Sequence, residues 1–147
     1  MKSRGFCCVG LESPKFSENI GGCLRACFCY NADMIAISGN RYSFNQKTDT
    51  PKAWKSIPTI HCNSVLDVVP KGSEIVAVDM VKDARELFNF VHPERAFYVF
   101  GGEDRTLDDS ILKKCKYKVY VPTQTCMNLS SCVNVVLYDR MRKQWNS

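Results

Sequence analysis

Short apolar runs alternate with segments of helical periodicity along the chain. Runs rich in β-favouring residues predict buried strands at residues 6–11, 34–37, 75–78, 97–100 and 118–121. Apolar positions spaced three and four apart predict helices at residues 18–30, 83–91, 107–114 and 127–145. Strands that alternate with helices indicate an α/β fold, in which a parallel sheet is covered by helices on both faces.

The first predicted helix has the clearest pattern. Its apolar face is formed by Ile20, Cys23, Leu24, Cys27 and Phe28. Ser17 is placed to cap the amino end of this helix. A polar stretch at residues 38–55 is expected to be a loop. No internal repeat, low-complexity tract or linker interrupts the pattern, so residues 1–147 are expected to form a single domain.

The composition is that of a globular protein and says little about a partner. Of the 147 residues, 45% are hydrophobic and 24% are charged, so the chain can bury a core without disulfide bonds. The formal net charge of +5 makes the chain mildly basic. This charge is compatible with a nucleic-acid partner, but it is far below that of a segment that binds by charge alone.

Nine cysteines raise the question of disulfides or a metal, and the pattern favours neither. Their number is odd, and neither an apolar signal segment nor a run of membrane length is present, so we expect reduced thiols in a cytoplasmic protein. Cys23, Cys27 and Cys29 lack the second ligand pair that a structural zinc site needs. His61 and His92 have no companion at ligand spacing, so we expect no metal.

The common nucleotide-binding motifs are absent from the sequence, which has no phosphate loop, no dinucleotide-binding glycine fingerprint and no nucleophile elbow. A glycine pair, Gly101 and Gly102, does follow an apolar strand directly and precedes Glu103. Glycines at the carboxyl end of a parallel strand let a ligand approach the backbone. On its own, the pair is more simply interpreted as a tight turn.

Three segments taken together change this interpretation. They read N-I-G-G-C-L-R at residues 19–25, F-G-G-E-D-R-T-L at residues 100–107 and V-P-T-Q-T-C-M-N-L-S at residues 121–130. In this order and spacing they resemble the three motifs of the SpoU–TrmH family of the SPOUT superfamily, which are RNA ribose 2′-O-methyltransferases. The run M-N-L-S-S-C-V-N-V-V-L-Y-D is most similar to the minimal members that methylate the ribose of the tRNA wobble nucleotide. The resemblance covers nearly the whole chain.

The resemblance implies a SPOUT-type parallel sheet flanked by helices, with a C-terminal deep trefoil knot. Periodicity alone could not predict such a knot, because true knots are nearly absent from proteins. The resemblance also implies a homodimer that packs through the last helix and uses S-adenosyl-L-methionine. The expected activity is 2′-O-methylation of a ribose in RNA. We favour tRNA because no further RNA-binding domain is apparent, with ribosomal RNA as the alternative.

The same resemblance assigns the cofactor pocket. It would be formed by strand ends, the glycine pair and the start of the last helix, namely Val78, Gly101, Gly102, Val121, Cys126, Met127, Leu129 and Ser130. Glycines allow close approach to the backbone, and aliphatic side chains can sandwich an adenine. Free N–H groups around Asn128 and Ser130, at the start of the last helix, would face polar atoms of the ligand.

The candidate catalytic residues are Arg25, Asn19, Glu103 and Asn128. On a helical wheel Arg25 lies opposite the apolar face, beside Gly21 and Gly22, and it corresponds to the arginine regarded as catalytic in the family. Because a guanidinium remains protonated in proteins, we expect Arg25 to hold phosphate and to stabilise the developing alkoxide, with the proton acceptor left open. The other three would position the reactants. For Asn19, a turn or cap hydrogen bond is an equally good interpretation.

The chain departs from the family pattern where cofactor and RNA would meet. Cys126 replaces the serine that precedes M-N-L-S, and Thr106 replaces a common glycine. The loop at residues 121–126 is shorter than usual. Two alternatives therefore stay open, a catalytically silent RNA-binding module of the same fold and an unrelated α/β enzyme whose glycine pair binds another nucleotide.

The last helix predicts a dimer from its residues alone. Between residues 129 and 138, apolar side chains go most of the way round the helical wheel, so this helix must be buried on two sides. Its own sheet can cover one side, and a twofold copy of the chain would cover the other, with Val136 at the interface. Arg140, Arg142 and Lys143 in its last turns would then flank an RNA path.

Overall fold

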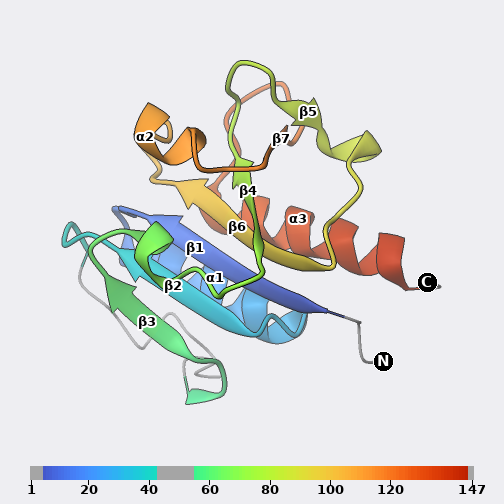
Figure 1. Ribbon diagram of the computed structural model, residues 1–147. Helices are drawn as coiled ribbons and strands as arrows, with labels where there is room; N and C mark the ends of the chain where they lie inside the picture. Colours follow the sequence, from blue (N-terminus) through green and yellow to red (C-terminus); the bar gives the residue numbers. More distant parts are fainter. Residues whose placement is uncertain (1–4, 43–54, 146–147) are drawn as a thin grey trace.

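The computed structural model describes residues 5–42 and 55–145, which contain one sheet of seven strands. The strands lie in the order β3-β2-β1-β6-β4-β7-β5, and the neighbouring pairs are parallel. Their bounds are β1 Phe6–Glu12, β2 Met34–Ser38, β3 Thr59–Cys62, β4 Glu74–Val78, β5 Arg85–Glu86, β6 Arg95–Gly101 and β7 Tyr117–Tyr120. The predicted parallel α/β fold is therefore confirmed (Figure 1).

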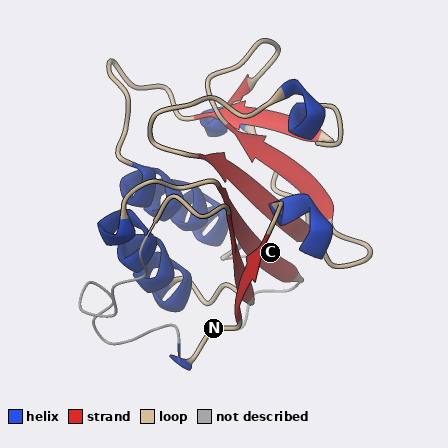
Figure 2. Cartoon of the chain, turned by 90° about the vertical axis from the view of Figure 1, so that its left-hand side faces the viewer, coloured by secondary structure: helices blue, strands red, loops and turns tan. Residues whose placement is uncertain are grey.

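Helical segments cover both faces of the sheet. The two long helices, α1 (Ser17–Cys29) and α3 (Leu129–Gln144), lie side by side on one face (Figure 2). The other face carries the short helix α2 (Asp109–Leu112) and the 3-10 turn η3 (Val65–Val68). The faces differ because only one of them receives helices long enough to bury a continuous apolar stripe.

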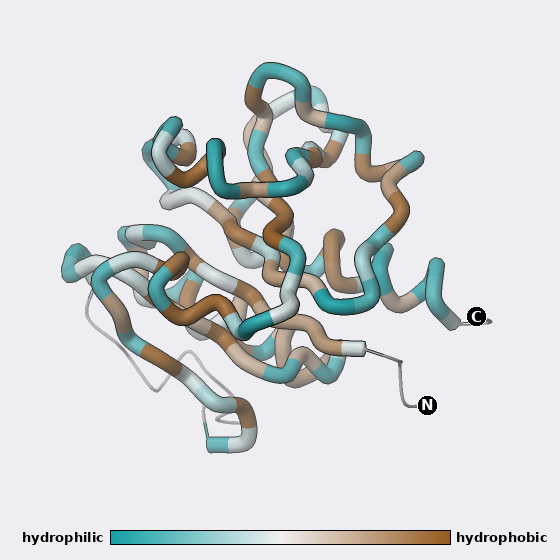
Figure 3. Tube along the Cα trace, viewed as in Figure 1, coloured by the Kyte–Doolittle hydropathy of each residue, from teal (hydrophilic) through white to brown (hydrophobic). Residues whose placement is uncertain are grey.

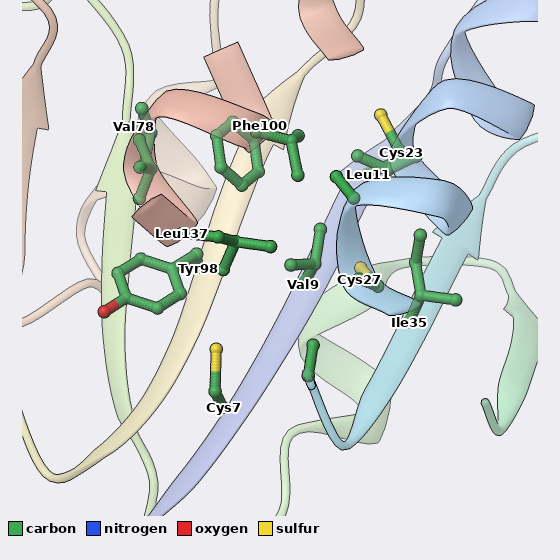
Figure 4. Packing of buried hydrophobic residues seen from close by; sticks show 14 of the residues in the cluster. Cys7, Val9, Leu11, Cys23, Cys27, Ile35, Val78, Tyr98, Phe100 and Leu137 are labelled. Atoms are coloured by element: carbon green, nitrogen blue, oxygen red, sulfur yellow. The ribbon is translucent and has the colours of Figure 1, made fainter. Parts of the chain in front are cut away.

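Side chains of the central strands alternate between two cores, as the twofold period of a strand requires. In β1, Val9 and Leu11 pack toward the long helices, whereas Cys8 belongs to the cluster that contains Val65 of η3. Figure 4 shows the first cluster, in which strand residues meet Leu137 of α3. Along the backbone, hydrophobic stretches coincide with the central strands and hydrophilic stretches with the connecting loops (Figure 3).

The predicted helix at residues 83–91 is wrong. The segment forms the short edge strand β5 and the 3-10 turn η4 (Leu87–Asn89). Leu87 and Phe90 are its buried residues, and their spacing of three suits a 3-10 turn as well as an α-helix. Asp83 has a positive φ of 67°, which interrupts helical geometry at one end. The proline that follows keeps the residue before it out of the α region at the other end.

The other helices occur where the pattern predicts them, with different ends. Helix α1 starts at Ser17, so Ser17 is helical and Phe16 occupies the N-cap position. Helix α2 is shorter than the predicted helix at residues 107–114, and α3 begins two residues later than predicted. The strand β3 was not expected. Much of the predicted loop at residues 38–55 lies outside the described residues.

Helix α3 buries its second side within its own chain, against α1. Val136 is 0% exposed, so its predicted place at a dimer interface is wrong. The prediction failed because it counted the sheet as the only surface that could cover α3. The apolar residues that α3 does expose are Val135 and Tyr138, at 36% and 51%.

Two of the three cations near the end of α3 serve the fold. Arg140 donates from Nη1 to the carbonyl oxygen of Pro93 at 2.7 Å and to the hydroxyl of Tyr98 at 3.1 Å. Lys143 donates from Nζ to the carbonyl oxygen of Leu87 at 2.7 Å. Arg140 and Lys143 therefore do not flank an RNA path as predicted. They are engaged in fastening α3 to the segment before β6.

A buried histidine completes this polar cluster. The Nδ1 atom of His92 lies 2.7 Å from the hydroxyl of Tyr98, and its Nε2 atom lies 2.7 Å from Oδ2 of Asp139. Asp139 also pairs with Lys143 at 2.7 Å. Neutral His92 satisfies every contact if Tyr98 donates to Nδ1 and Nε2–H donates to Asp139. The third cation, Arg142, has a side chain that is 55% exposed.

The cysteines of the chain are free thiols. Burial raises the pKa of Cys7 to about 12 and holds those of Cys23 and Cys27 well above their usual value. Such thiols pack as small apolar groups and are poor metal ligands. Within residues 5–42 and 55–145, no group of three potential ligand side chains could hold a metal ion, and no helix is long and apolar enough to cross a membrane.

Candidate active site

The carboxyl ends of parallel strands lie along one edge of a sheet, and this edge contains the candidate site. Strand β6 is central there, with β1, β2 and β3 on one side and β4 and β7 on the other. It ends at Gly101, which is followed by Gly102 and Glu103. Strands lie on opposite sides of β6, so the strand order reverses at this point. Ligands of open α/β sheets commonly bind at such a switch point.

Glu103 joins the end of β6 to the amino end of α1. Its Oε1 accepts from the backbone N–H of Lys15 at 2.9 Å. Its Oε2 accepts from the backbone N–H of Phe16 at 2.9 Å and from the side-chain amide of Asn19 at 2.8 Å. Phe16 has no side-chain acceptor of its own, so Glu103 supplies one from a distant segment. The predicted cap by Ser17 is wrong, because Ser17 is already the first helical residue and Phe16 holds the N-cap position.

Asn128 extends the network to α3. Its Nδ2 donates to Oδ1 of Asn19 at 2.9 Å. Its Oδ1 accepts from the backbone N–H groups of Ser130 at 3.0 Å and Ser131 at 3.3 Å, which caps α3. These N–H groups are therefore engaged, contrary to the expectation that they are free for a ligand. The network joins all three motif segments.

The carboxylate of Glu103 is held in its charged form. Partial burial acts to raise its pKa, but the hydrogen bonds from Asn19, Lys15 and Phe16 outweigh burial, and the pKa lies below its usual value. A carboxylate with a lowered pKa and both oxygens occupied is a poor proton acceptor. The geometry therefore favours a positioning role for Glu103.

Gly102 is required by the packing of the protein itself. A Cβ at this position would lie 2.5 Å from the carbonyl oxygen of Ser13 and 2.7 Å from Nη2 of Arg41. At Gly101, an added Cβ would meet the carbonyl oxygen of Arg105 at 3.1 Å. Because Gly102 has no side chain, the loop between β1 and α1 can pack closely against it. A substitution of Gly102 would disturb that loop before it tested any ligand.

Most residues assigned to the cofactor gather on the β4 and β7 side of β6. One apolar cluster contains Val78, Val121 and Leu129. Cys126, which is exposed, and Met127 belong to the adjoining segment at residues 122–127. Within the described part of the chain, this segment forms no backbone–backbone hydrogen bond. The carbonyl oxygen of Thr125 accepts from Oγ1 of Thr123 at 2.7 Å. The other backbone groups of the segment, beside aliphatic side chains, suit a ligand with a heteroaromatic ring and polar atoms.

Arg25 lies on the exposed side of α1, next to the contact between α1 and α3. Gly22, three residues earlier, is closely packed, because a Cβ there would lie 2.7 Å from Cβ of Ser130. Gly21 is buried as well. Gly22 therefore lets α1 and α3 approach each other beside Arg25.

Sequence reasoning missed two groups that hold the loop after the glycine pair. Asp79 follows β4 directly, and its carboxylate accepts from the backbone N–H of Leu107 at 2.9 Å and of Met80 at 2.8 Å. Arg41 pairs with Asp104 at 2.9 Å from the other side of the loop. An acidic residue at the carboxyl end of an apolar strand was the available signal for Asp79. No local pattern marks Arg41, because its partner is distant in sequence.

A polar pocket of about 180 Å³ opens on the β1 side of β6. It is lined by the ends of β1, β2 and β6, the residue after β3 and the loop after the glycine pair, including Glu12, Ser38, Asn63, Gly102, Thr106 and Asp108. Sequence analysis could not find it, because its residues come from segments far apart in the chain. It borders the same glycine pair as the residues assigned to the cofactor.

Comparison with known proteins gives a family and a fold. The SpoU rRNA Methylase family matches residues 7–138 of the chain. No curated protein matches the sequence. Among solved structures, the SpoU methyltransferase AviRb from Streptomyces viridochromogenes, in complex with AdoMet, is 19% identical with a TM-score of 0.84, covering 99% of this chain and 63% of that one.

Two further structures are similar over the whole chain. The AdoMet-bound rRNA methyltransferase from Sinorhizobium meliloti is 18% identical with a TM-score of 0.84, covering 95% of this chain and 57% of that one. A structure described as giving insights into the 2-OH methylation of C/U34 on tRNA is 16% identical with a TM-score of 0.80, covering 97% and 99%. The chain thus spans about three fifths of the first two enzymes and nearly all of the third.

Proposed function

Because the chain belongs to the SpoU rRNA Methylase family, we propose that it methylates the 2′-hydroxyl of a ribose in RNA with S-adenosyl-L-methionine as methyl donor. The observation that carries the proposal is the network of Glu103, Asn19 and Asn128, which joins the three motif segments at one edge of the sheet. Polar groups fixed by one another can hold a ribose without reorganising as the reaction proceeds.

The residues on the β4 and β7 side of β6 fit the cofactor. S-adenosyl-L-methionine supplies an electrophilic methyl group on a sulfonium. The residues that would hold it are Val78, Gly101, Gly102, Val121, Cys126, Met127, Leu129 and Ser130. Aliphatic side chains would pack on the adenine, and backbone groups of residues 122–127, which make no backbone–backbone hydrogen bond among the described residues, would bind its polar edge. The side chain of Ser130 bonds Asn128 at 2.7 Å, so Ser130 would contribute mainly through its position.

Arg25 is the proposed catalytic cation. Arg25 belongs to the exposed side of α1, beside the contact with α3, where an RNA phosphate would approach it. Two parallel N–H donors match a phosphate, and the positive charge stabilises the alkoxide that develops as the 2′-hydroxyl loses its proton. Asn19, Glu103 and Asn128 act as positioning residues. The proton acceptor is left open.

The proposed substrate is tRNA. The structure described in terms of C/U34 methylation on tRNA is covered over 99% of its length, so a chain of this size matches it as a whole. Ribosomal RNA is the second candidate, because the Sinorhizobium meliloti relative is an rRNA methyltransferase. The C-terminal trefoil knot and a cytoplasmic location, which suits nine free thiols, belong to the same proposal.

We also propose a homodimer that packs through the long helices. Val135 and Tyr138 of α3 are 36% and 51% exposed, and Phe28 of α1 is 46% exposed. Tyr138 lies edge-on to Tyr30, the residue that follows α1, with ring centroids 6.4 Å apart, so the exposed groups of the two helices adjoin. A twofold copy of this surface would bury them.

The cofactor assignment is tested by Cys126→Trp. Cys126 is exposed in the segment at residues 122–127, so the larger side chain should occupy ligand space and leave the core intact. We expect calorimetric titration with S-adenosyl-L-methionine to show binding to the wild type and at least about a tenfold weaker affinity for the variant. Cys29→Trp, at another exposed cysteine, is the matched control. Equal affinities of both variants would remove residue 126 from the cofactor site.

The same titration separates the enzyme from its strongest rival, a silent RNA-binding module. Cys126 and the short loop favour that rival, because both lie where the cofactor would bind. A wild-type chain that folds and binds RNA without binding S-adenosyl-L-methionine would contradict the proposed enzyme.

A further inference from the structure

We propose that the polar pocket on the β1 side of β6 receives the base of the nucleotide whose ribose is methylated, and that it selects bases with an exocyclic amino group. This inference rests on the proposed function and adds a specificity-determining site to it.

The carboxyl edge of the sheet is divided by β6. Residues assigned to the cofactor lie on the β4 and β7 side, whereas the pocket is formed on the side of β1, β2 and β3. Gly101 and Gly102 border both halves. A methyl donor in one half and an acceptor nucleotide in the other would therefore meet at the end of β6, where Glu103 begins the network.

Two carboxylates, those of Glu12 and Asp108, belong to the polar lining of the pocket. Oε2 of Glu12 is occupied, accepting from Oγ of Ser38 at 2.8 Å and from the backbone N–H of Val65 at 3.0 Å, which fixes the side chain in place. Asp108 stands at the N-cap position of α2 without making a side-chain cap bond. An ionised carboxylate only accepts hydrogen bonds, so these groups favour a ligand edge that donates them.

Two neutral side chains can complete the recognition. Among the described residues, neither Asn63 nor Thr106 makes a side-chain hydrogen bond, and both line the pocket. An asparagine amide offers a donor and an acceptor side by side, which matches the paired groups on a base edge. Arg105 also lines the pocket, and its Nε lies 3.7 Å from Oδ1 of Asp104, which is not among the lining residues. Because this cation is already paired, the two carboxylates of the lining disfavour phosphate, so the base rather than the phosphate of a nucleotide fits here.

The size of the pocket agrees with a single base. Its volume of about 180 Å³ is below the range of sites that enclose drug-sized ligands, and it is open to solvent on one side. RNA-binding proteins commonly recognise unstacked bases of loops by hydrogen bonds to their edges. Cytosine and uracil have the same shape and differ in the amino or carbonyl group at one position, so they are the matched pair of probes.

The experiment is an NMR titration of the intact chain, saturated with S-adenosylhomocysteine, with cytidine or uridine 5′-monophosphate. We expect the cytidine nucleotide to bind about tenfold more tightly, the scale of one good base contact. Asn63→Ala should weaken its binding several-fold. Asp108→Asn should reduce the preference, because an amide can donate to the carbonyl of uracil. Asn89→Ala, at an exposed asparagine of η4, is the matched control.

Equal affinities for the two nucleotides, or an unchanged preference in Asp108→Asn, would overturn the inference. Loss of S-adenosylhomocysteine binding in Asn63→Ala would assign the pocket to the cofactor, which also overturns it while leaving the proposed methyl transfer intact. Selective binding of the cytidine nucleotide by a chain that methylates no RNA would support the proposed base pocket and contradict the proposed methyltransferase function.

Discussion

Glu103 and Asn128 perform the same physical task at the two long helices. Each supplies a side-chain acceptor to backbone N–H groups at the amino end of a helix, and each is bonded to Asn19. The N–H groups that begin a helix need such partners. Because the same three side chains border the proposed ribose site, stability and positioning depend on the same hydrogen bonds.

His92 makes a pH dependence of stability predictable. Burial lowers its pKa to about 4, since Asp139 only partly compensates and Lys143 and Arg140 add to the lowering. In the unfolded chain the same group titrates near its ordinary value of 6.5. Below that value the unfolded state binds a proton at His92, whereas the folded state does not. Stability should therefore fall as the pH decreases from 6.5 to about 4, and His92 should contribute no pH dependence above this range.

Urea denaturation measured between about pH 7 and about pH 5 tests this. We expect a smaller decrease of the unfolding free energy for His92→Gln than for the wild type over that interval. His61→Gln, at an exposed histidine, should behave like the wild type. Parallel pH profiles of the wild type and His92→Gln would show that the histidine accepts a proton in the folded state.

Among the secondary-structure elements, the buried strands and the long helices were predictable, whereas the edge strands of the sheet were not. Strands β1, β2, β4 and β6 contain continuous apolar runs, because both of their faces are covered. Strand β3 is only partly buried and β5 is exposed, so neither contains such a run. The amino end of α1 could not be interpreted locally, since its acceptor is Glu103.

The candidate site was predictable only to the level of its segments. The motif resemblance identified Asn19, Glu103 and Asn128, and the structure joins them by hydrogen bonds. The motif resemblance could not reveal the pocket that contains Asn63, because Asn63 lies outside the three motif segments. Tertiary contacts decide such features, and a single sequence does not contain them in a local pattern.

The contact of α1 with α3 predicts a coupled pair of substitutions. In Gly22→Ala, the new Cβ would lie 2.7 Å from Cβ of Ser130, so the helices must separate. Overpacking of this kind costs about 1–3 kcal/mol, which exceeds the gain in helix propensity of about 1 kcal/mol. Ser130→Gly in the same chain removes the obstructing atoms and should restore part of the loss.

A double-mutant cycle in urea measures this coupling. We expect a favourable interaction energy between the two substitutions and a lower methyl-transfer rate for Gly22→Ala, because the bond between Asn19 and Asn128 would be strained. Additive effects of the two substitutions would mean that residues 22 and 130 do not limit the approach of the helices.

At the scale of the molecule, the long helices have two tasks. Their inner faces close the core of the chain, and their outer faces expose Val135, Tyr138 and Phe28. A dimer through these residues would place Arg25 of each chain near the edge of the shared surface, since Arg25 belongs to the exposed side of α1. If the proposed dimer forms, we therefore expect the activity to depend on the association state.

Val135→Asp tests the dimer. We expect the wild type to be a dimer in size-exclusion chromatography with light scattering at micromolar concentration, and the variant to be a folded monomer, because a charge in a buried apolar contact is costly. Val136→Asp, one residue along, should instead unfold the chain, since Val136 is 0% exposed. A dimeric Val135→Asp variant, or a fully active monomer, would contradict the proposed interface.

If the chain transfers a methyl group to a ribose hydroxyl, the position of a labelled methyl group in the RNA reveals it. The chain is incubated with tRNA and S-adenosyl-L-methionine that carries a tritiated methyl group, and the RNA is then hydrolysed in alkali. A methylated 2′-hydroxyl cannot attack the adjoining phosphodiester, so we predict label in alkali-resistant dinucleotides. Arg25→Ala should lower the rate by on the order of 10²-fold, with Arg25→Lys restoring little of it. Label recovered in mononucleotides, or a rate unchanged by Arg25→Ala, would contradict this mechanism.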